Sequence, residues 1–200
     1  MKLKIDGNIT EARTGLSLLD LVKELGMITG KLSADPIAAK IAGEVFTLNY
    51  IPIREKETQA DRPSMRRAMA ASGGKVQLLR YSDPSGKDAY IRTAQFILFY
   101  AISRLWPKAV AKMKCTVGPG VFISVKEADE FSAELLSSEV ERIVAEDIPL
   151  IRSRVSTREA ITYYESHGQP DKARLLSWRP WDFFDEYVYG DFADYYYGEM

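Results

Sequence analysis

The feature that most constrains the fold is the stretch 90–107, the most apolar continuous run in the chain. A helix that is apolar on nearly all sides is usually buried in a domain core. Pro107 should end this helix, because a proline ring cannot continue a helix interior. The run borders on membrane-spanning length, but the charges of Arg92 and Arg104 interrupt it, which favours a core helix. The sequence therefore predicts a buried helix over 90–106 that supports a domain, and no membrane segment.

Bulk composition excludes several classes of protein. The 200 residues are 46% hydrophobic, which suits an ordinary globular core. A net charge of −1 gives no general attraction to nucleic acid or to an anionic membrane. The single cysteine excludes an internal disulfide, and the N-terminus lacks the apolar core of a secretion signal. We expect a cytoplasmic protein.

Charge is nevertheless unevenly distributed along the chain. Residues 181–200 hold nine aromatics and six acids, with no Lys or Arg. Residues 104–114 hold four basic residues and no acid: Arg104, Lys108, Lys112 and Lys114.

The first part of the chain has the pattern of a small mixed sheet crossed by one helix. Asp6-Gly7-Asn8 is a hairpin turn signal. Ser17 opens a helix through a variant of the capping box, with Asp20 three residues later. The strands are predicted at 2–5, 9–12, 36–41, 45–48 and 75–80, and a polar loop at 52–74. This order predicts a β-grasp arrangement, an α+β fold.

A linker is predicted over 81–88, where Pro84 and Gly86 fall, so the domains are predicted as 1–80 and 81–200. In the second domain the strands are predicted at 109–117, 121–125, 150–155 and 187–189, and the helices after the core helix at 127–146, 156–167 and 171–177. Five apolar residues of the helix over 127–146 are expected to face inward: Phe131, Leu135, Val140, Ile143 and Val144.

Three stretches of the first domain carry a family pattern: Asp6-Gly7, 15–25 and 37–50. Together they resemble a TGS domain, the ubiquitin-like module of threonyl-tRNA synthetases, certain GTPases and alarmone synthetases. Residues 88–200 resemble the second additional domain that follows TGS in threonyl-tRNA synthetases. The resemblance implies an α+β fold with a ubiquitin-like β-grasp (TGS) domain, followed by an α+β domain like the second additional domain of threonyl/alanyl-tRNA synthetases.

Three further motifs, at 92–98, 168–176 and 194–200, are similar to a bacterial family in which the same two domains precede a uridine kinase-like P-loop domain. This resemblance implies the N-terminal, non-catalytic part of a uridine kinase-like (nucleoside kinase) protein. The chain stops inside the last motif, which suggests that it is cut from a longer protein. ATP and Mg²⁺ are then expected only for a kinase domain outside these residues, and that domain is the expected neighbour.

The sequence departs from the synthetase pattern at four positions. The editing domains of those enzymes carry a His-x-x-x-His pair on the core helix and a Cys-x-x-x-His pair near the domain end. Here the corresponding positions hold Arg92 and Phe96, and Tyr196 and Met200. Arg stays protonated and Phe has no lone pair, so neither can bind a metal. We expect no metal, no cofactor and no aminoacyl-tRNA hydrolysis within this chain.

Each candidate residue has a structural and a functional interpretation. Arg92 could pair with an acid of the 181–200 tail such as Asp194, because a buried arginine needs such a partner, or it could bind phosphate or an RNA backbone. Lys112 and Lys114 alternate along one strand, and they could form either a solvated face or a contact with RNA phosphates. The lone Cys115 is expected to be a small buried hydrophobe.

Two further features bear on ligand binding. The aromatic tail could stack bases, but its six acids should repel a phosphate backbone. It is therefore expected to cover the domain core or to form an interaction edge. Ser72-Gly73-Gly74-Lys75 superficially resembles a phosphate loop, but Met69 and Val76 replace the Gly and the Ser or Thr of that motif.

Three functions remain open from the sequence. The leading hypothesis is a non-catalytic region that binds a nucleotide or RNA, or that regulates a neighbouring kinase domain. The second is a stand-alone trans-editing hydrolase, which the missing ligands disfavour. The third is a structural or dimerising module that uses the aromatic tail, with a homodimer as the expected state.

Overall fold

The computed structural model describes residues 1–53, 63–118, 120–196 and 198–200. Its contacts divide the chain into two compact units. Unit 1 comprises 1–90, 151–188 and 193–200, and unit 2 comprises 91–150 and 189–192. The domain assignment of 1–80 and 81–200 stays a prediction. None of the helices in the described residues is both long and apolar enough to cross a membrane.

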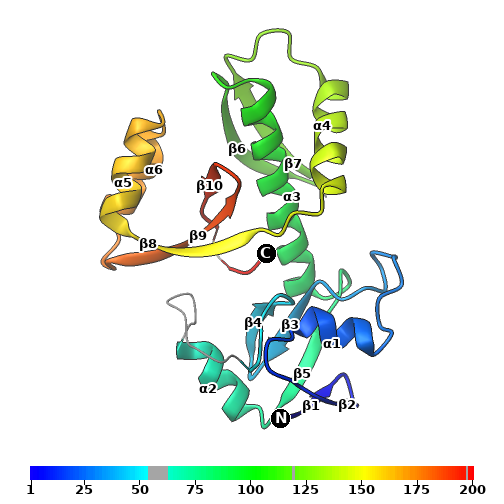
Figure 1. The fold of residues 1–200 in the computed structure, drawn as a ribbon. Helices are drawn as coiled ribbons and strands as arrows, with labels where there is room; N and C mark the ends of the chain where they lie inside the picture. The colour runs from blue at the N-terminus through cyan, green and yellow to red at the C-terminus, as the bar shows by residue number, and fades with distance from the viewer. Residues whose placement is uncertain (54–62, 119, 197) are drawn as a thin grey trace. The chain divides into compact units, whose positions relative to one another are not determined.

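The start of unit 1 is a five-stranded mixed sheet in the order β2-β1-β5-β3-β4. The strands are β1 (Lys2–Ile5), β2 (Asn8–Glu11), β3 (Ala38–Ile41), β4 (Glu44–Thr47) and β5 (Lys75–Leu79). β1 pairs with β5 in parallel, and β1–β2, β3–β4 and β3–β5 are antiparallel. The predicted strands are thus confirmed to within about two residues at each end. Figure 1 shows helix α1 (Leu18–Glu24) beside this sheet.

Helix α1 (Leu18–Glu24) begins at the predicted capping box. The Ser17 hydroxyl accepts from the Asp20 backbone N–H at 3.1 Å, and the Asp20 carboxylate accepts from the Ser17 backbone N–H at 2.9 Å. Leu18, Leu21 and Val22 are buried in a core formed with sheet residues such as Phe46. Fold and sequence resemblance agree here: the chain is α+β and opens with a ubiquitin-like β-grasp.

The predicted polar loop over 52–74 is wrong in its second half. Helix α2 (Pro63–Ala71) lies there, while 54–62 fall outside the described residues. The polar composition of 52–74 suggested a loop. The segment over 63–71 is nevertheless rich in Ala and Met, which favour helices. Ala68 and Met69 are buried in the β-grasp core, so tertiary packing supports the helix.

The Ser72-Gly73-Gly74 segment ends α2 and forms no phosphate loop. The Ser72 hydroxyl donates to the Met69 carbonyl at 3.0 Å. Gly73 and Gly74 both have positive φ, of 57° and 78°. A Cβ on Gly74 would lie 2.7 Å from the Lys2 carbonyl oxygen, so only glycine fits against β1.

The predicted linker over 81–88 is largely helical. Helix α3 (Pro84–Leu105) starts six residues before Tyr90, because Pro84 suits a first helical position and the Lys87 N–H donates to the Asp83 carbonyl at 2.8 Å. Within unit 1, Ala89 packs against Ala38 and Leu79 of the sheet. The helix ends at Leu105, one residue before the predicted end at 106.

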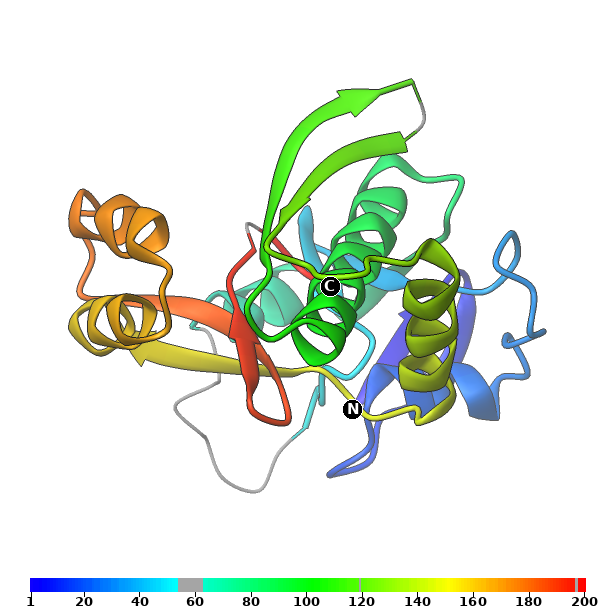
Figure 2. The ribbon, with the colours of Figure 1, turned by 90° about the horizontal axis from the view of Figure 1, so that it is seen from above.

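Unit 2 contains the rest of α3, a two-stranded sheet and one further helix. The sheet is an antiparallel ribbon of β6 (Val110–Val117) and β7 (Gly120–Lys126). Figures 1 and 2 show it beside α3 and α4 (Ala133–Ala145). The helix over 127–146 is shorter than predicted: α4 (Ala133–Ala145) begins after the N-cap Ser132. Of its expected core residues only Ile143 is buried, and Phe131, Leu135 and Val144 are exposed, so their inward placement is wrong. Phe131 still packs against the Trp106 ring, with 4.9 Å between centroids.

The last part of unit 1 is a three-stranded sheet in the order β10-β9-β8 with two helices. The strands are β8 (Ile151–Ser156), β9 (Phe183–Tyr189) and β10 (Phe192–Asp194). Helix α5 (Thr157–Ser166) opens with the predicted capping box, since the Ser156 hydroxyl accepts from the Glu159 N–H at 3.1 Å. Helix α6 (Pro170–Ser177) follows and packs beside α5 (Figure 2). This part of unit 1, residues 151–188 and 193–200, is called the lobe. Tyr164, Leu176 and Phe184 form its core.

Candidate functional site

The β6–β7 ribbon carries three lysines and no acid: Lys112, Lys114 and Lys126. From Arg104 to Lys126 the sequence has five basic residues and no acid. Lys112 and Lys114 are both exposed on β6. The pairing shifts between Met113 and Cys115, so a bulge at Lys114 interrupts the simple alternation expected for the two lysines. The ribbon thus presents cations and exposed apolar groups. Among the described strands of unit 2, none pairs with its outer edges.

Cys115 lies on the same ribbon and is exposed, so its predicted burial is wrong. Each strand of a two-stranded ribbon pairs with only one other strand. Either face of such a ribbon can therefore remain in contact with solvent. Exposed apolar side chains flank the cysteine: Met113, Val117 and Phe122.

The first pair of editing-site positions lies one turn apart on α3, in unit 2. Arg92 is half-buried and Phe96 is fully buried. The Phe96 ring packs edge-on against Phe192, with 5.2 Å between centroids. Position 96 is therefore filled by aromatic packing, while the roles proposed for Arg92 stay predictions.

The second pair lies at the chain end, in unit 1. Tyr196 and Met200 are half-buried, and the Met200 N–H donates to the Tyr187 hydroxyl at 3.2 Å. Burial, and then the charge of Asp194, raise the pKa of Tyr196 well above its usual range, so its hydroxyl stays protonated. Within the described ranges, no group of three or more His, Cys, Asp or Glu side chains is placed to hold a metal.

Acids of the aromatic tail are paired inside unit 1. The Arg152 guanidinium on β8 contacts both the Asp185 carboxylate on β9 and the buried Glu199 carboxylate. The Tyr187 hydroxyl also lies within 3.4 Å of Glu199. Burial raises the pKa of Glu199 while Arg152 lowers it, and burial prevails. The cluster holds the last residues against the sheet.

Asp194, the acid expected to pair with Arg92, has Lys172 of α6 as its ionic partner within unit 1. The Lys172 ammonium donates to Asp194 Oδ1 at 2.6 Å, and the Tyr195 N–H donates to the same oxygen at 2.8 Å. Neither Lys172 nor Arg152 stood out in the sequence, because their partners lie 22 to 47 residues away. Only the folded sheet brings these residues together.

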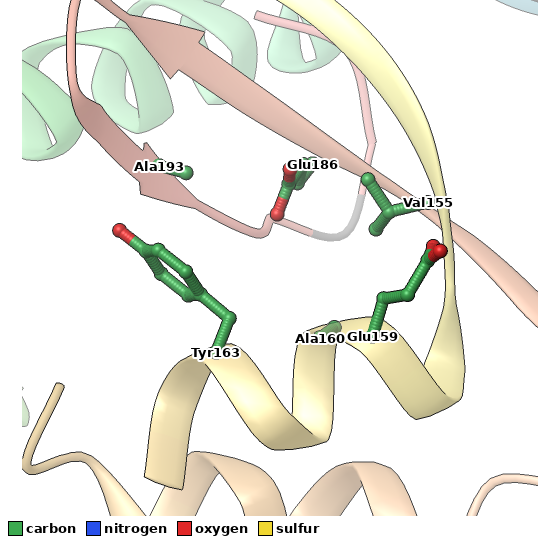
Figure 3. A pocket seen from close by; sticks show the side chains of 6 residues that line it. All are labelled: Val155, Glu159, Ala160, Tyr163, Glu186 and Ala193. Atoms are coloured by element: carbon green, nitrogen blue, oxygen red, sulfur yellow. The ribbon is translucent and has the colours of Figure 1, made fainter. Parts of the chain in front are cut away.

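A cavity of about 310 Å³ lies between α5 and the three-stranded sheet. Its walls are Val155, Glu159, Ala160, Tyr163, Glu186 and Ala193. Figure 3 shows Glu186 pointing from β9 toward the helix that carries Tyr163. Burial, and then the charge of Asp194, raise the pKa of Glu186. The buried hydroxyl of Tyr164 makes no hydrogen bond to the described residues. The sequence did not indicate this cavity.

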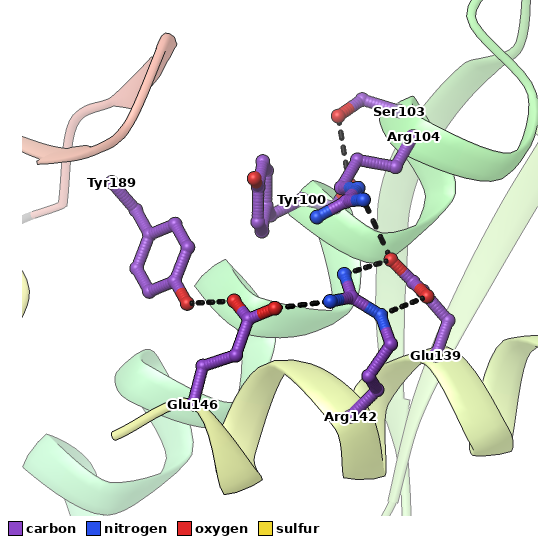
Figure 4. Close-up of polar contacts among 7 residues, drawn as sticks. All are labelled: Tyr100, Ser103, Arg104, Glu139, Arg142, Glu146 and Tyr189. Carbon is purple, nitrogen blue, oxygen red and sulfur yellow. Dashed lines mark hydrogen bonds and ion pairs between the residues drawn. The ribbon is translucent and has the colours of Figure 1, made fainter. Parts of the chain in front are cut away.

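A second polar network, in unit 2, ties α4 to α3 (Figure 4). Glu139 accepts two hydrogen bonds of 2.9 Å from Arg142 and lies 3.1 Å from Arg104 Nε on α3. The Arg142 hydrogen bonds lower the pKa of Glu139. Arg142 also contacts Glu146, which accepts from the Tyr189 hydroxyl at 2.9 Å. Every member has a partner, so we assign this network a structural role.

The two parts of the fold define an α+β protein with a ubiquitin-like β-grasp, followed by a region like the second additional domain of threonyl/alanyl-tRNA synthetases. No family model matches the chain. Relatives do match: the threonine–tRNA ligase of Clostridium kluyveri is 28% identical over 193 residues, which cover 94% of this chain and 27% of that protein. The threonine–tRNA ligase of Finegoldia magna is 28% identical over 203 residues, covering 97% and 28%. That of Desulforamulus reducens is 25% identical over 193 residues, covering 94% and 27%.

The chain therefore spans little more than a quarter of the length of these relatives. The similarity supports the threonyl-tRNA synthetase-like part of the predicted resemblance. No finding supports a uridine kinase parent.

Proposed function

We propose that this chain is a non-catalytic RNA-binding module whose β6–β7 ribbon contacts the phosphate backbone of tRNA. The observation that carries the proposal is the exposed pair Lys112 and Lys114 within a stretch of five basic residues and no acid. Lysines on an exposed ribbon can neutralise phosphates without reading sequence. The named function of the relatives, which join threonine to tRNA, supports tRNA as the nucleic acid.

Arg92 is the second proposed contact. Its guanidinium could hold a phosphate group by two parallel hydrogen bonds. Either an RNA backbone or a nucleotide would supply that phosphate group. The proposal requires no metal or cofactor in this chain. A uridine kinase-like neighbour, with its own ATP and Mg²⁺, rests on motif similarity alone and stays part of the hypothesis.

Binding of labelled tRNA, followed by fluorescence anisotropy at low salt, tests the proposal. Lys112→Ala/Lys114→Ala should weaken binding by about tenfold, because two phosphate contacts are lost. The matched control is Lys31→Ala/Lys40→Ala, which removes the same charge from exposed positions of unit 1. Equal affinities for both double variants, or no binding by the native chain, would refute the RNA-binding role.

A trans-editing hydrolase is the second candidate, because the similar proteins are tRNA ligases. The residues at the four editing positions weigh against it, since Arg92, Phe96, Tyr196 and Met200 offer no metal ligand suited to such a site. Release of the amino acid from mischarged tRNA by the purified chain, with zinc bound in a one-to-one ratio, would establish the hydrolase instead.

A further inference from the structure

The turn between α6 and β9 exposes three large aromatic side chains within six residues. Trp178 is 83% exposed, Trp181 64% and Phe183 52%. Leu175, one helical turn before Trp178, is also exposed. Exposed apolar side chains are unremarkable singly, but four large ones within residues 175–183 indicate a candidate binding surface.

Backbone contacts hold this turn in place, so its exposure is built into the fold. The Arg179 N–H donates to the Leu176 carbonyl at 3.0 Å. The Thr157 hydroxyl donates to the Trp181 carbonyl at 2.6 Å, and the Thr157 N–H donates to the Asp182 carbonyl at 2.8 Å. The rings are thus presented on a fixed backbone, which lowers the entropy cost of binding.

Cationic groups lie over two of these rings. The Arg179 guanidinium is 5.7 Å from the Trp181 ring centroid, and the Arg154 guanidinium is 5.6 Å from the Phe183 centroid. Arg154 is exposed on β8 beside the turn. A surface that combines basic groups with aromatic faces is typical of proteins that bind single-stranded nucleic acid.

Ion pairs within the lobe reduce the repulsion that the six acids of the tail suggested from the sequence. Arg152 pairs with both Asp185 and Glu199, and Lys172 pairs with Asp194, so two cations face three carboxylates. These three carboxylates are directed into contacts within the lobe. Two of the six negative charges of the tail are therefore offset within the lobe, which reduces the expected repulsion of a phosphate backbone.

We propose that Trp178, Trp181 and Phe183 form a stacking platform for unpaired RNA bases, with Arg154 and Arg179 as the accompanying cations. This inference rests on the proposed function only in taking RNA as the ligand, and it uses a surface other than the β6–β7 ribbon. Stacking on aromatic faces tolerates any base, so the platform should prefer unpaired segments without preferring a sequence.

The test uses a labelled oligouridylate, which has little structure of its own, and a blunt RNA duplex as the comparison ligand. The native chain should bind the single strand more tightly than the duplex and show quenched tryptophan fluorescence. Trp178→Ala/Trp181→Ala should weaken single-strand binding by at least about tenfold. Trp178→Phe/Trp181→Phe should largely retain it, because a smaller ring still stacks. Ile9→Ala, at another exposed apolar position of unit 1, is the control and should have no effect.

Three results would overturn the platform: equal binding of strand and duplex, no loss in the Trp→Ala variant, or a change in molecular mass of that variant in sedimentation. The last would show a protein-docking surface in place of an RNA site. Failure of the platform can be distinguished from failure of the proposed function. If tRNA binding depends on Lys112 and Lys114 but is unchanged by substitution of both tryptophans, the platform is refuted and the proposed function is retained.

Discussion

The Lys172 ammonium lies 2.6 Å from the Asp194 carboxylate and joins helix α6 to strand β10. Asp194 is buried, and its carboxylate also accepts a backbone hydrogen bond from Tyr195. An acid that the sequence places in a repelling tail is therefore compensated within the lobe. This pair, together with the Arg152 cluster, explains how so acidic a segment can cover a core.

Replacing Lys172 with Met should destabilise the chain by about 1–3 kcal/mol, because Asp194 would remain buried without its cation. The free energy of unfolding in urea gives the measurement. Lys126→Met, at an exposed ribbon position, is the matched control and should cost less than about 0.5 kcal/mol. Equal costs for the two variants would show that the Lys172–Asp194 pair contributes nothing to the lobe.

Gly74→Ala should destabilise the chain more than Gly73→Ala. Both glycines have positive φ, so both substitutions should cost about 1 kcal/mol in backbone conformation. Only at Gly74 would the new Cβ collide with a backbone oxygen, that of Lys2, whereas nothing lies within 4 Å at Gly73. Thermal unfolding of both variants measures the difference, and an equal loss would contradict the close approach of α2's end to β1.

Glu186→Gln should stabilise the chain at neutral pH. Burial and the charge of Asp194 raise the folded-state pKa of Glu186, so the folded state binds this proton more tightly than the unfolded state does. The stabilising contribution of the protonated carboxyl is therefore lost as pH rises from the unfolded pKa through the raised folded pKa. The amide of the variant stays neutral throughout.

The advantage of the Glu186→Gln variant should vanish near about pH 3, where the native Glu186 is protonated as well. Urea unfolding at several pH values measures it. Glu165→Gln, on the exposed end of α5, is the control. If Glu186→Gln raises the free energy of unfolding by the same amount at every pH, then ionisation of Glu186 does not destabilise the native chain.

Glu139→Gln should loosen α4 from α3 without unfolding the chain. The variant keeps the side-chain shape but removes the charge that holds Arg142 and Arg104. Amide hydrogen exchange in α4 should become faster, while α1 in unit 1 should not change. Glu141→Gln, on an exposed position of the same helix, is the control, and the same acceleration in both would argue against a specific role for Glu139.

Local signals in the sequence were sufficient for much of the fold. The capping boxes at Ser17 and Ser156 predicted the starts of α1 and α5, because a cap depends on residues three positions apart. The Asp6-Gly7 turn predicted the first hairpin for the same reason. Where local structure depends on residues within one or two turns along the chain, the sequence pattern is sufficient to predict it.

The errors arose where distant packing decides the outcome. Helix α2 exists because Ala68 and Met69 reach the β-grasp core, which a polar local composition does not reveal. The exposure of Leu135 and Cys115 depends on which elements cover α4 and the ribbon. The lysines of the ribbon could be predicted as candidates from composition, whereas Lys172, Arg152 and the aromatic turn required the folded lobe.

The salt dependence of tRNA affinity tests the central claim most directly. For the native chain, the logarithm of the association constant should fall linearly with the logarithm of salt concentration, because phosphate contacts release counterions. In Lys112→Ala/Lys114→Ala the slope should be shallower by about 1.5 to 2, close to one for each lost contact. A slope that both chains share would contradict the proposal that the β6–β7 ribbon binds the RNA backbone.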